Sequence, residues 1–416
     1  MHDRTEAYSL LRAAGPIVAC SDGTYIATTQ RGVRDVLTRS KVFSSTITSH
    51  MLGSPIPLVP EGIDPPRHTE VRHFLQPHFA PGKMDELVPT IRAQCRRLID
   101  GFIANGACDA AEEFATPFPP LVFLTWFGLP TADLPLMARW EQQIAAGASA
   151  FSTDLRASAK AATDEALSYL RALIAERKRR PAESSDLLSR LLADTSPGCL
   201  DDEELLSLVF LFLLAGLGTV SAMLTTSLTL LAQDTGLRRQ IVDDPELIPA
   251  AVNELLRFDP PAPFMPRMAT QDTTVEGYPI PEGALVIAAI GAANRDLPED
   301  AAPDVIDFHR DQRQARNLAL GLGPHYCLGA PLALREGEIA LREWHKQIPD
   351  YSLAPGAAPR VDWPRTSVRF TSVPLVFPGS DGPSHSRETS ELTERIHLDE
   401  ETCRSATGVV PPAGPA

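Results

Sequence analysis

One short stretch of the chain combines a thiol, an imidazole and several glycines, and these residue types could do chemistry. In LGLGPHYCLGAPLALRE, residues 320–336, glycines precede Cys327 at positions 321 and 323 and follow it at Gly329. Glycines placed in this way indicate a loop whose backbone comes close to another group. The apolar pattern after Cys327 predicts a helix that begins there. A thiol at a helix N-terminus faces free backbone N–H groups and the positive end of the helix dipole, which favours the thiolate.

Three uses of such a thiolate remain open from the residues alone. A zinc site needs three further ligands, and the loop offers only His325. A nucleophilic cysteine needs a histidine or asparagine partner, which the sequence does not exclude. A haem thiolate ligand needs one cysteine, with glycines where the loop lies on the macrocycle. An inert cysteine in a helix-capping loop would leave the glycines on both sides of Cys327 unexplained.

The loop resembles the haem-binding stretch of the cytochrome P450 superfamily, Phe-Gly-x-Gly-x-His-x-Cys-x-Gly. The matching positions are Gly321, Gly323, His325, Cys327 and Gly329. Leu320 stands where the family usually has Phe, and Leu334 stands where it usually has Arg, with Arg335 one residue further on. The resemblance implies that Cys327 is the metal ligand, an axial thiolate on the iron of haem b, and that Leu320 lies beside the cofactor and alters the shielding of the sulfur.

Further segments occur in the family's order and imply contacts to the haem propionates. His68 and Arg72, in DPPRHTEVR, lie four residues apart on one predicted helix face. Arg267 and His325 resemble the remaining propionate donors. A cluster of cations suits two carboxylates in a largely apolar pocket. Without this context, His68 would be interpreted as an ordinary histidine at a helix start.

The segment ELLR, Glu254 to Arg257, resembles the family's Glu-x-x-Arg pair. Such a pair on a helix is usually a solvated surface pair. Its position between a long apolar helix and the cysteine loop predicts a buried ion pair instead, with Arg310 as its third member. We expect these three residues to hold the haem-side core and to have a structural role.

The elements that position these residues include a long uncharged run. No Asp, Glu, Lys or Arg occurs from Leu205 to Ala232, a length that would suffice for a membrane span. The run lacks the basic flank and the Trp or Tyr belt of a spanning helix. We therefore predict a buried central helix over residues 202–233, with an N-cap at Asp201 or Asp202 and an end near Gly236.

The middle of this helix resembles the family's oxygen-binding segment, Ala-Gly-x-acid-Thr-Thr/Ser. In AGLGTV, residues 215–220, Ala215 would lie against the haem and Thr219 would be the catalytic hydroxyl. Gly218 stands at the acidic position and Val220 at the second hydroxyl position. Either Gly218 makes room and water relays protons unaided, or a polar group of the substrate or a side chain from another segment takes over the relay.

The rest of the chain is predicted to be mainly helical, with small β-sheets. A hairpin is expected at 16–29, a long loop at 43–66, strand-turn-strand texture after Pro260 and a last strand at 367–377. Helical periodicity covers 31–39, 68–79, 84–105, 110–127, 132–149, 154–180, 184–194, 202–233 and 245–257. We predict one large cytochrome P450-like domain over 1–377, and an acidic, polar, disordered tail over 378–416.

Composition excludes several classes of protein. The 416 residues carry a net charge of −15, which argues against binding to nucleic acid or to anionic lipid. Six scattered cysteines without a CxxC indicate a reducing cytoplasm, and the N-terminus lacks the apolar core of a signal peptide.

The resemblance implies a soluble bacterial monooxygenase that inserts one oxygen atom of dioxygen into an apolar small molecule. Its electrons would come from a small acidic ferredoxin that docks on the Cys327 side, where Arg313, Arg316, Arg342 and Lys346 are the exposed candidates. The expected substrate contacts are Leu214, Phe264, Met265 and Phe370. The missing acid keeps two alternatives open. One is a haem-thiolate enzyme with unusual proton delivery, which performs oxidative coupling or peroxide-driven oxidation, and the other is a haem-binding protein without turnover.

Overall fold

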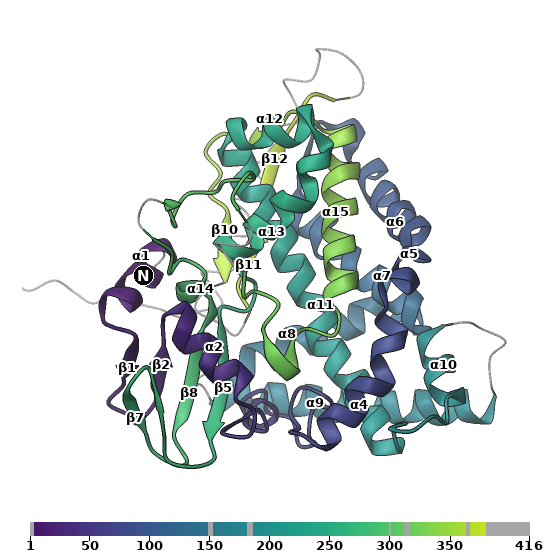
Figure 1. Ribbon diagram of the computed structural model, residues 1–416. Helices are drawn as coiled ribbons and strands as arrows, with labels where there is room; N and C mark the ends of the chain where they lie inside the picture. Colours follow the sequence, from purple (N-terminus) through teal and green to yellow (C-terminus); the bar gives the residue numbers. More distant parts are fainter. Residues whose placement is uncertain are drawn as a thin grey trace, which may run out of the picture.

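The computed structural model describes residues 4–148, 153–180, 186–298, 301–311, 317–362 and 367–379. These form a body of packed helices beside a smaller β region (Figure 1). Residues 380–416 lie outside the described part, so the predicted disorder of the tail stays a prediction.

Helices make up most of the described chain. They are α1 (Arg4–Ala13), α2 (Gln30–Thr38), α3 (Ile47–Met51), α4 (Arg67–Leu75), α5 (Pro81–Asp85), α6 (Val88–Asp100), α7 (Phe118–Phe127), α8 (Leu134–Ala148), α9 (Thr153–Arg179), α10 (Leu187–Ala193), α11 (Asp202–Gln233), α12 (Thr235–Asp243), α13 (Ile248–Phe258), α14 (Ile290–Ala293) and α15 (Ala330–Gln347). The fold is therefore mainly α, as predicted.

The strands form small sheets. They are β1 (Ile17–Ala19), β2 (Tyr25–Ala27), β3 (Phe43–Ser44), β4 (Ala107–Asp109), β5 (Phe264–Ala269), β6 (Thr273–Val275), β7 (Tyr278–Ile280), β8 (Leu285–Ala289), β9 (Ser352–Leu353), β10 (Arg360–Asp362), β11 (Arg369–Ser372) and β12 (Pro374–Val376). The largest sheet has the order β1-β2-β8-β5-β3, with β2 and β8 parallel and the other neighbours antiparallel. Smaller sheets are β4-β12-β9, β10-β11 and β6-β7.

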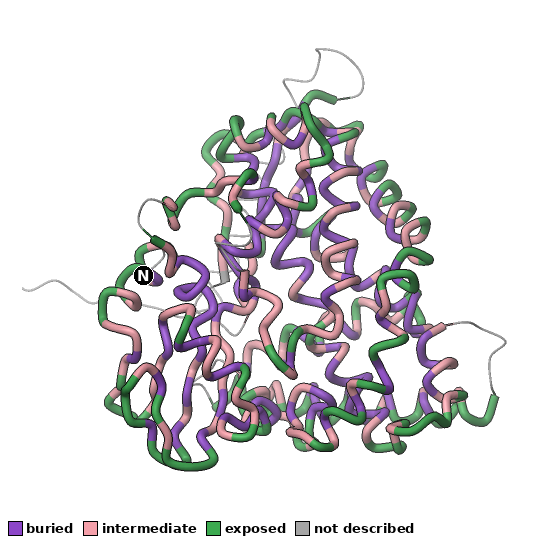
Figure 2. Tube along the Cα trace, viewed as in Figure 1, coloured by how far each residue is buried: buried purple, intermediate pink, exposed green. Residues whose placement is uncertain are grey.

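The predicted central helix is α11, which runs through the middle of the helical body (Figures 1 and 2). Asp201 caps it: its carboxylate accepts from the N–H of Glu204 at 2.8 Å, and the Glu204 carboxylate accepts from the N–H of Asp201 at 3.1 Å. Within the described chain, α11 alone is long and apolar enough to cross a membrane, but 78% of its apolar window is buried in the protein. It is therefore a core helix, and it packs against α7, α8, α9, α13 and α15.

Several boundaries differ from the prediction for local reasons. Helix α11 ends at Gln233 instead of near Gly236, because Asp234 accepts from the N–H of Leu237 and starts the unpredicted α12. The expected helix over 84–105 is divided into α5 and α6, and the one over 110–127 into a π-helical turn (Ala110–Ala115) and α7. Both α6 and α7 begin with a proline in the first turn, where the missing N–H costs nothing. The expected strand over 367–377 is two strands, β11 and β12, in different sheets.

Candidate functional site

One face of α11 is left uncovered in the middle of the helix. Between Leu205 and Ala232 only Ala215 is exposed, and Thr219, one turn later, is half-buried. Leu214, Phe212 and Gly216 are also incompletely buried, whereas residues on both sides of this stretch are packed in the core. The Thr219 hydroxyl donates to the Ala215 carbonyl at 2.9 Å. The middle of a core helix therefore faces a hollow, as a helix over a flat cofactor would.

The Cys327 loop has a defined local geometry. The N–H of Cys327 donates to the Leu320 carbonyl at 2.8 Å, and the N–H groups of Gly329 and Ala330 are directed at the thiol sulfur. Burial nevertheless raises the pKa of the Cys327 thiol, and these N–H groups offset the increase only in part. The N–H groups at the start of the helix therefore favour the thiolate, as expected, while burial of the sulfur acts in the opposite direction.

Two loop glycines have left-handed backbone conformations. Gly321 has φ +74° and Gly323 has φ +72°. A Cβ on Gly323 would also lie 2.8 Å from the carbonyl oxygen of Leu37, at the end of α2. Gly323 thus allows the loop to pass against α2, which explains in physical terms why glycine is needed there.

Gly323→Ala is expected to lower the free energy of unfolding by about 1–3 kcal/mol and to reduce haem content, because it adds a steric clash to a strained φ. Thermal unfolding and absorbance of the purified protein measure both effects. Gly283→Ala is the matched control, since Gly283 has φ +78° and no neighbouring atom within 4 Å of a Cβ. Equal losses in the two variants would show that the approach to Leu37 contributes nothing.

The predicted propionate donors come together from three separate segments. The rings of His68, on α4, and His325 lie 4.1 Å apart between centroids. Arg267, on β5, is buried and its Nη1 lies 3.7 Å from a carboxylate oxygen of Glu61. The other Glu61 oxygen lies 3.7 Å from Nδ1 of His325. Arg72, one turn after His68, is close enough for the charges of Glu61 and Cys327 to act on it.

Burial determines the charge of this cluster. Burial lowers the pKa of His68 to about 4, and the positive charge of Arg72 lowers it further. Burial also lowers the pKa of His325 to about 2, and there the positive charge of Arg267 is the next cause. Both histidines are therefore neutral at pH 7, and the fixed positive charge comes from Arg72 and Arg267. The cluster would attract anions mainly through the two arginines.

Two observations test whether the cluster fits a haem. Both ring nitrogens of His68 are buried and have no hydrogen-bond partner among the described residues, and such orphaned groups need a ligand or water. A carboxylate of the chain itself, that of Glu61, lies between the guanidinium of Arg267 and the ring of His325. Burial raises the pKa of Glu61, while Arg267 and Arg72 lower it. The cluster thus has both the spare hydrogen-bonding groups and the charge to hold propionates. Glu61 itself carried no sequence signal, because it lies in an irregular loop.

The predicted ion-pair network is buried. Arg257 donates to both carboxylate oxygens of Glu254 at 2.7 and 2.8 Å, and Arg310 donates to the same carboxylate at 3.0 Å. Glu254 is 0% exposed and Arg257 is 1% exposed. Arg257 also donates to the carbonyls of Asn294, Pro303 and Val305, so it ties α13 to the segment that precedes the cysteine loop.

The remaining predicted substrate contacts have mixed surroundings. Leu214 lies on α11 beside the hollow and is half-buried. On β5, Met265 shares a face with Arg267, while Phe264 lies on the opposite face and packs with the Tyr8 cluster. Phe370, on β11, has the guanidinium of Arg4 over its ring at 5.3 Å. Their role as substrate contacts stays a prediction.

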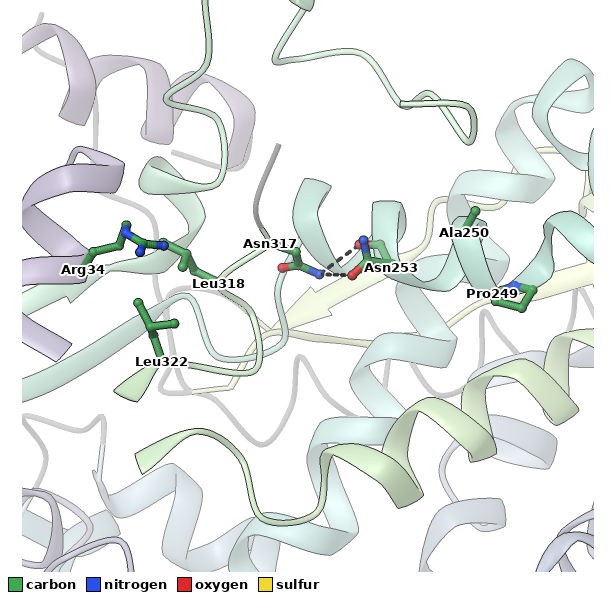
Figure 3. Close-up of a pocket in the computed structure, with 7 residues that line it drawn as sticks. All are labelled: Arg34, Pro249, Ala250, Asn253, Asn317, Leu318 and Leu322. Atoms are coloured by element: carbon green, nitrogen blue, oxygen red, sulfur yellow. Dashed lines mark hydrogen bonds between the residues drawn. The ribbon is translucent and has the colours of Figure 1, made fainter. Parts of the chain in front are cut away.

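A cavity of about 520 Å³ lies elsewhere, between α2, α13 and the segment that leads into the cysteine loop (Figure 3). Asn317 bridges to Asn253 on its floor, donating to the carbonyl and side-chain oxygens at 2.9 and 3.0 Å. None of its lining residues is a predicted haem contact, so this cavity is distinct from the hollow under α11.

The structure also bears on the other uses of the thiol. Within the described part of the chain, no group of three or more His, Cys, Asp or Glu side chains could hold a metal ion, so the described residues around Cys327 do not form a zinc site. The ring nitrogens of His325 face Ser45, at 3.2 Å, and Glu61, so this histidine is not placed as a base for Cys327. One thiol at the start of a helix, without further metal-ligating side chains grouped around it in the described part of the chain, fits the donor set of a haem-thiolate protein.

Comparisons with known proteins agree with this class. The model of the cytochrome P450 family matches residues 242–343, which include α13 and the Cys327 loop. A probable cytochrome P450 127A1 of Sinorhizobium fredii is 34% identical over 81% of this chain and 80% of its own length. The erythromycin C-12 hydroxylase of Saccharopolyspora erythraea is 35% identical over 75% of this chain and 78% of its own length.

Solved structures agree as well. The open cytochrome P450 EryK of S. erythraea superposes with a TM-score of 0.82 at 29% identity, and covers 93% of this chain and 99% of its own. The fold and the relatives define a haem-thiolate oxidoreductase. The chain belongs to the cytochrome P450 family, and it is a P450-type monooxygenase.

Proposed function

We propose that the protein binds haem b through Cys327 and hydroxylates an apolar small molecule with electrons from a ferredoxin-type donor. The observation that carries this proposal is the open face of α11 at Ala215 and Thr219, together with the cation cluster around His68. We also infer a cytoplasmic location, consistent with the bacterial relatives and with the burial of α11.

Different residues of the chain would bind the cofactor, exclude water and hydrogen-bond water near the reacting centre. A bound haem would supply dioxygen activation, with electron density from the Cys327 thiolate. Arg72, Arg267 and the two histidines would hold its carboxylates. The apolar side chains around the hollow would exclude water from the reacting centre. The Thr219 hydroxyl donates to the Ala215 carbonyl, and its oxygen is left to accept a hydrogen bond from water.

The proposed substrate class rests on the predicted contacts and on the names of the relatives. Leu214, Phe264, Met265 and Phe370 are the proposed apolar contacts. Relatives are named for hydroxylation of erythromycin and of vitamin D(3), the latter 32% identical over 88% of this chain. Both names support a small-molecule substrate and hydroxylation as the reaction.

The proposed function is tested by the absorption spectrum of the reduced, carbon-monoxide-bound protein, followed by turnover with ferredoxin and its reductase on apolar candidates. A red-shifted carbon-monoxide band and a hydroxylated product are expected. A protein without that band is not a haem-thiolate protein. Product formed only with hydrogen peroxide would favour peroxide-driven oxidation, and a coupled dimer would favour oxidative coupling.

The electron donor is proposed to dock on basic residues of α15, the helix that leads away from Cys327. Lys346 is exposed, and Arg342 lies 3.2 Å from Glu246 in a surface ion pair. The other two candidates, Arg313 and Arg316, lie outside the described residues.

Replacing Arg342 and Lys346 by Glu is expected to slow reduction by an acidic ferredoxin about tenfold at low salt, with a smaller effect at high salt, because steering charges are screened. Stopped-flow reduction across ionic strengths measures this. Lys160→Glu, in a surface pair on α9, is the control and should change little. A rate independent of salt and of both substitutions would contradict docking at this site.

A further inference from the structure

The space beside Gly218 is filled by an acid from another helix. A Cβ built on Gly218 would lie 2.8 Å from Oε1 of Glu141 and 3.5 Å from its Cδ. Cβ atoms essentially never lie that close to another heavy atom. A side chain at 218 and the carboxylate of Glu141 in its present position therefore exclude each other. The absence of a side chain at Gly218 leaves space beside α11, and the Glu141 carboxylate occupies that space.

Glu141 is an unusual residue for its position on α8. It lies on the buried stripe of that helix with Met137, Trp140 and Ile144, and it is 8% exposed. A carboxylate on such a stripe costs free energy of desolvation, which a partner must offset. Arg369 of β11 is one partner, with its Nη1 3.6 Å from Oε2 of Glu141. Since α8 and β11 both pack against α11, the ion pair lies where three elements meet.

We propose that Glu141 supplies protons to the reacting centre, reaching from α8 into the place where the family carries an acid on the central helix. This inference rests on the proposed function. It selects one of the alternatives that the sequence left open, a side chain from another segment. The neighbouring Thr219 is on the open face of α11, so a carboxyl beside Gly218 is one residue away from that face.

The proton balance is simple. Monooxygenation consumes dioxygen, two electrons from the ferredoxin-type donor and two protons; one oxygen atom enters the product and the other leaves as water. The Glu141 carboxylate would take up a proton from solvent and pass it to water beside Gly218, so it returns to the carboxylate after each transfer. Arg369, as a positioning residue, would hold the carboxylate on the Gly218 side.

The first test is kinetic and uses the holoenzyme. Glu141→Gln keeps the shape but removes the acid, and is expected to slow product formation about 100-fold and to raise the solvent isotope effect, with haem content and the carbon-monoxide band unchanged. Glu165→Gln, which alters an exposed ion pair with Arg139, is the control and should leave the rate unchanged. Returning the acid to the central helix, in Glu141→Ala with Gly218→Asp, should recover at least a tenth of the wild-type rate, and Glu141→Ala alone should not.

The outcomes separate the inference from the function on which it rests. A wild-type rate in Glu141→Gln overturns the inference. The inference is also overturned if Glu141→Gln forms product slowly but has an unchanged solvent isotope effect, and if Glu141→Ala with Gly218→Asp does not recover the rate. Glu141 would then only connect α8 to β11. Failure of the proposed function would be seen in the wild type itself, as a missing carbon-monoxide band or missing product.

A second test needs no turnover. Gly218→Ala is made in the wild type and in Glu141→Ala, and thermal unfolding of the four purified proteins is compared. Alanine is the better helix former, so the substitution should raise the unfolding temperature more where the carboxylate is gone than where it must be displaced. Equal shifts in the two backgrounds would show that Glu141 does not occupy the space beside Gly218, and would overturn the inference.

Discussion

Cys327→His is expected to remove the red-shifted carbon-monoxide band of the reduced protein completely. The band depends on thiolate electron density on the metal, which an imidazole does not supply. The N–H groups of Gly329 and Ala330 are directed at sulfur, so the loop is arranged for this atom. The measurement is the carbon-monoxide difference spectrum of protein matched for haem content.

The other cysteines provide the controls. Cys95 and Cys108 are buried, Cys20 is partly exposed and Cys199 is exposed. Alanine at any of them should leave the band in place, and so should alanine at Cys403, which lies outside the described residues. Loss of the band in one of these variants with Cys327 intact would refute the assignment.

Glu254→Gln is expected to lower the free energy of unfolding by about 3–5 kcal/mol, because it leaves the buried Arg257 guanidinium without its counter-charge. The carboxylate also accepts from Arg310 and from the N–H of Asp307, so its loss affects two further segments. Urea unfolding followed by circular dichroism gives the free energy, and haem content shows whether the cofactor side is affected.

The matched control for this substitution is on α9. Glu176 and Arg179 have the same Glu-x-x-Arg spacing, but both side chains are about half or more exposed. Glu176→Gln should change the free energy of unfolding by no more than about 0.5 kcal/mol. Similar losses at both positions would mean that burial does not set the strength of the Glu254–Arg257 pair.

The sequence predicted the elements whose signals are local. The uncharged run with Asp201 before it defined α11, and the glycines around Cys327 indicated a loop in contact with other backbone. Helix α12 was missed because Gly236 resembled the end of α11, although it lies in the first turn of the next helix. Asp234 caps the N-terminus of α12, and this cap shows that a new helix begins there. The sequence pattern alone did not distinguish it from the end of α11.

The functional residues that were not predicted from the sequence make contacts between segments that are far apart in the chain. Glu61 meets Arg267 and His325 only after segments far apart in the chain come together. Glu141 did leave one signal: it falls on the apolar stripe of its helix, four residues after Met137 and three before Ile144. An acid at such a position indicates a buried partner or a function, but its neighbour Gly218 is visible only in three dimensions.

The mutual exclusion of Glu141 and a side chain at Gly218 has an evolutionary consequence. A side chain on the central helix at position 218 would displace the Glu141 carboxylate from its present position. The residue types at the two positions are therefore expected to depend on each other. Among natural relatives, an acidic residue at one of these positions should accompany a non-acidic residue at the other, and sequences with acids at both should be rare.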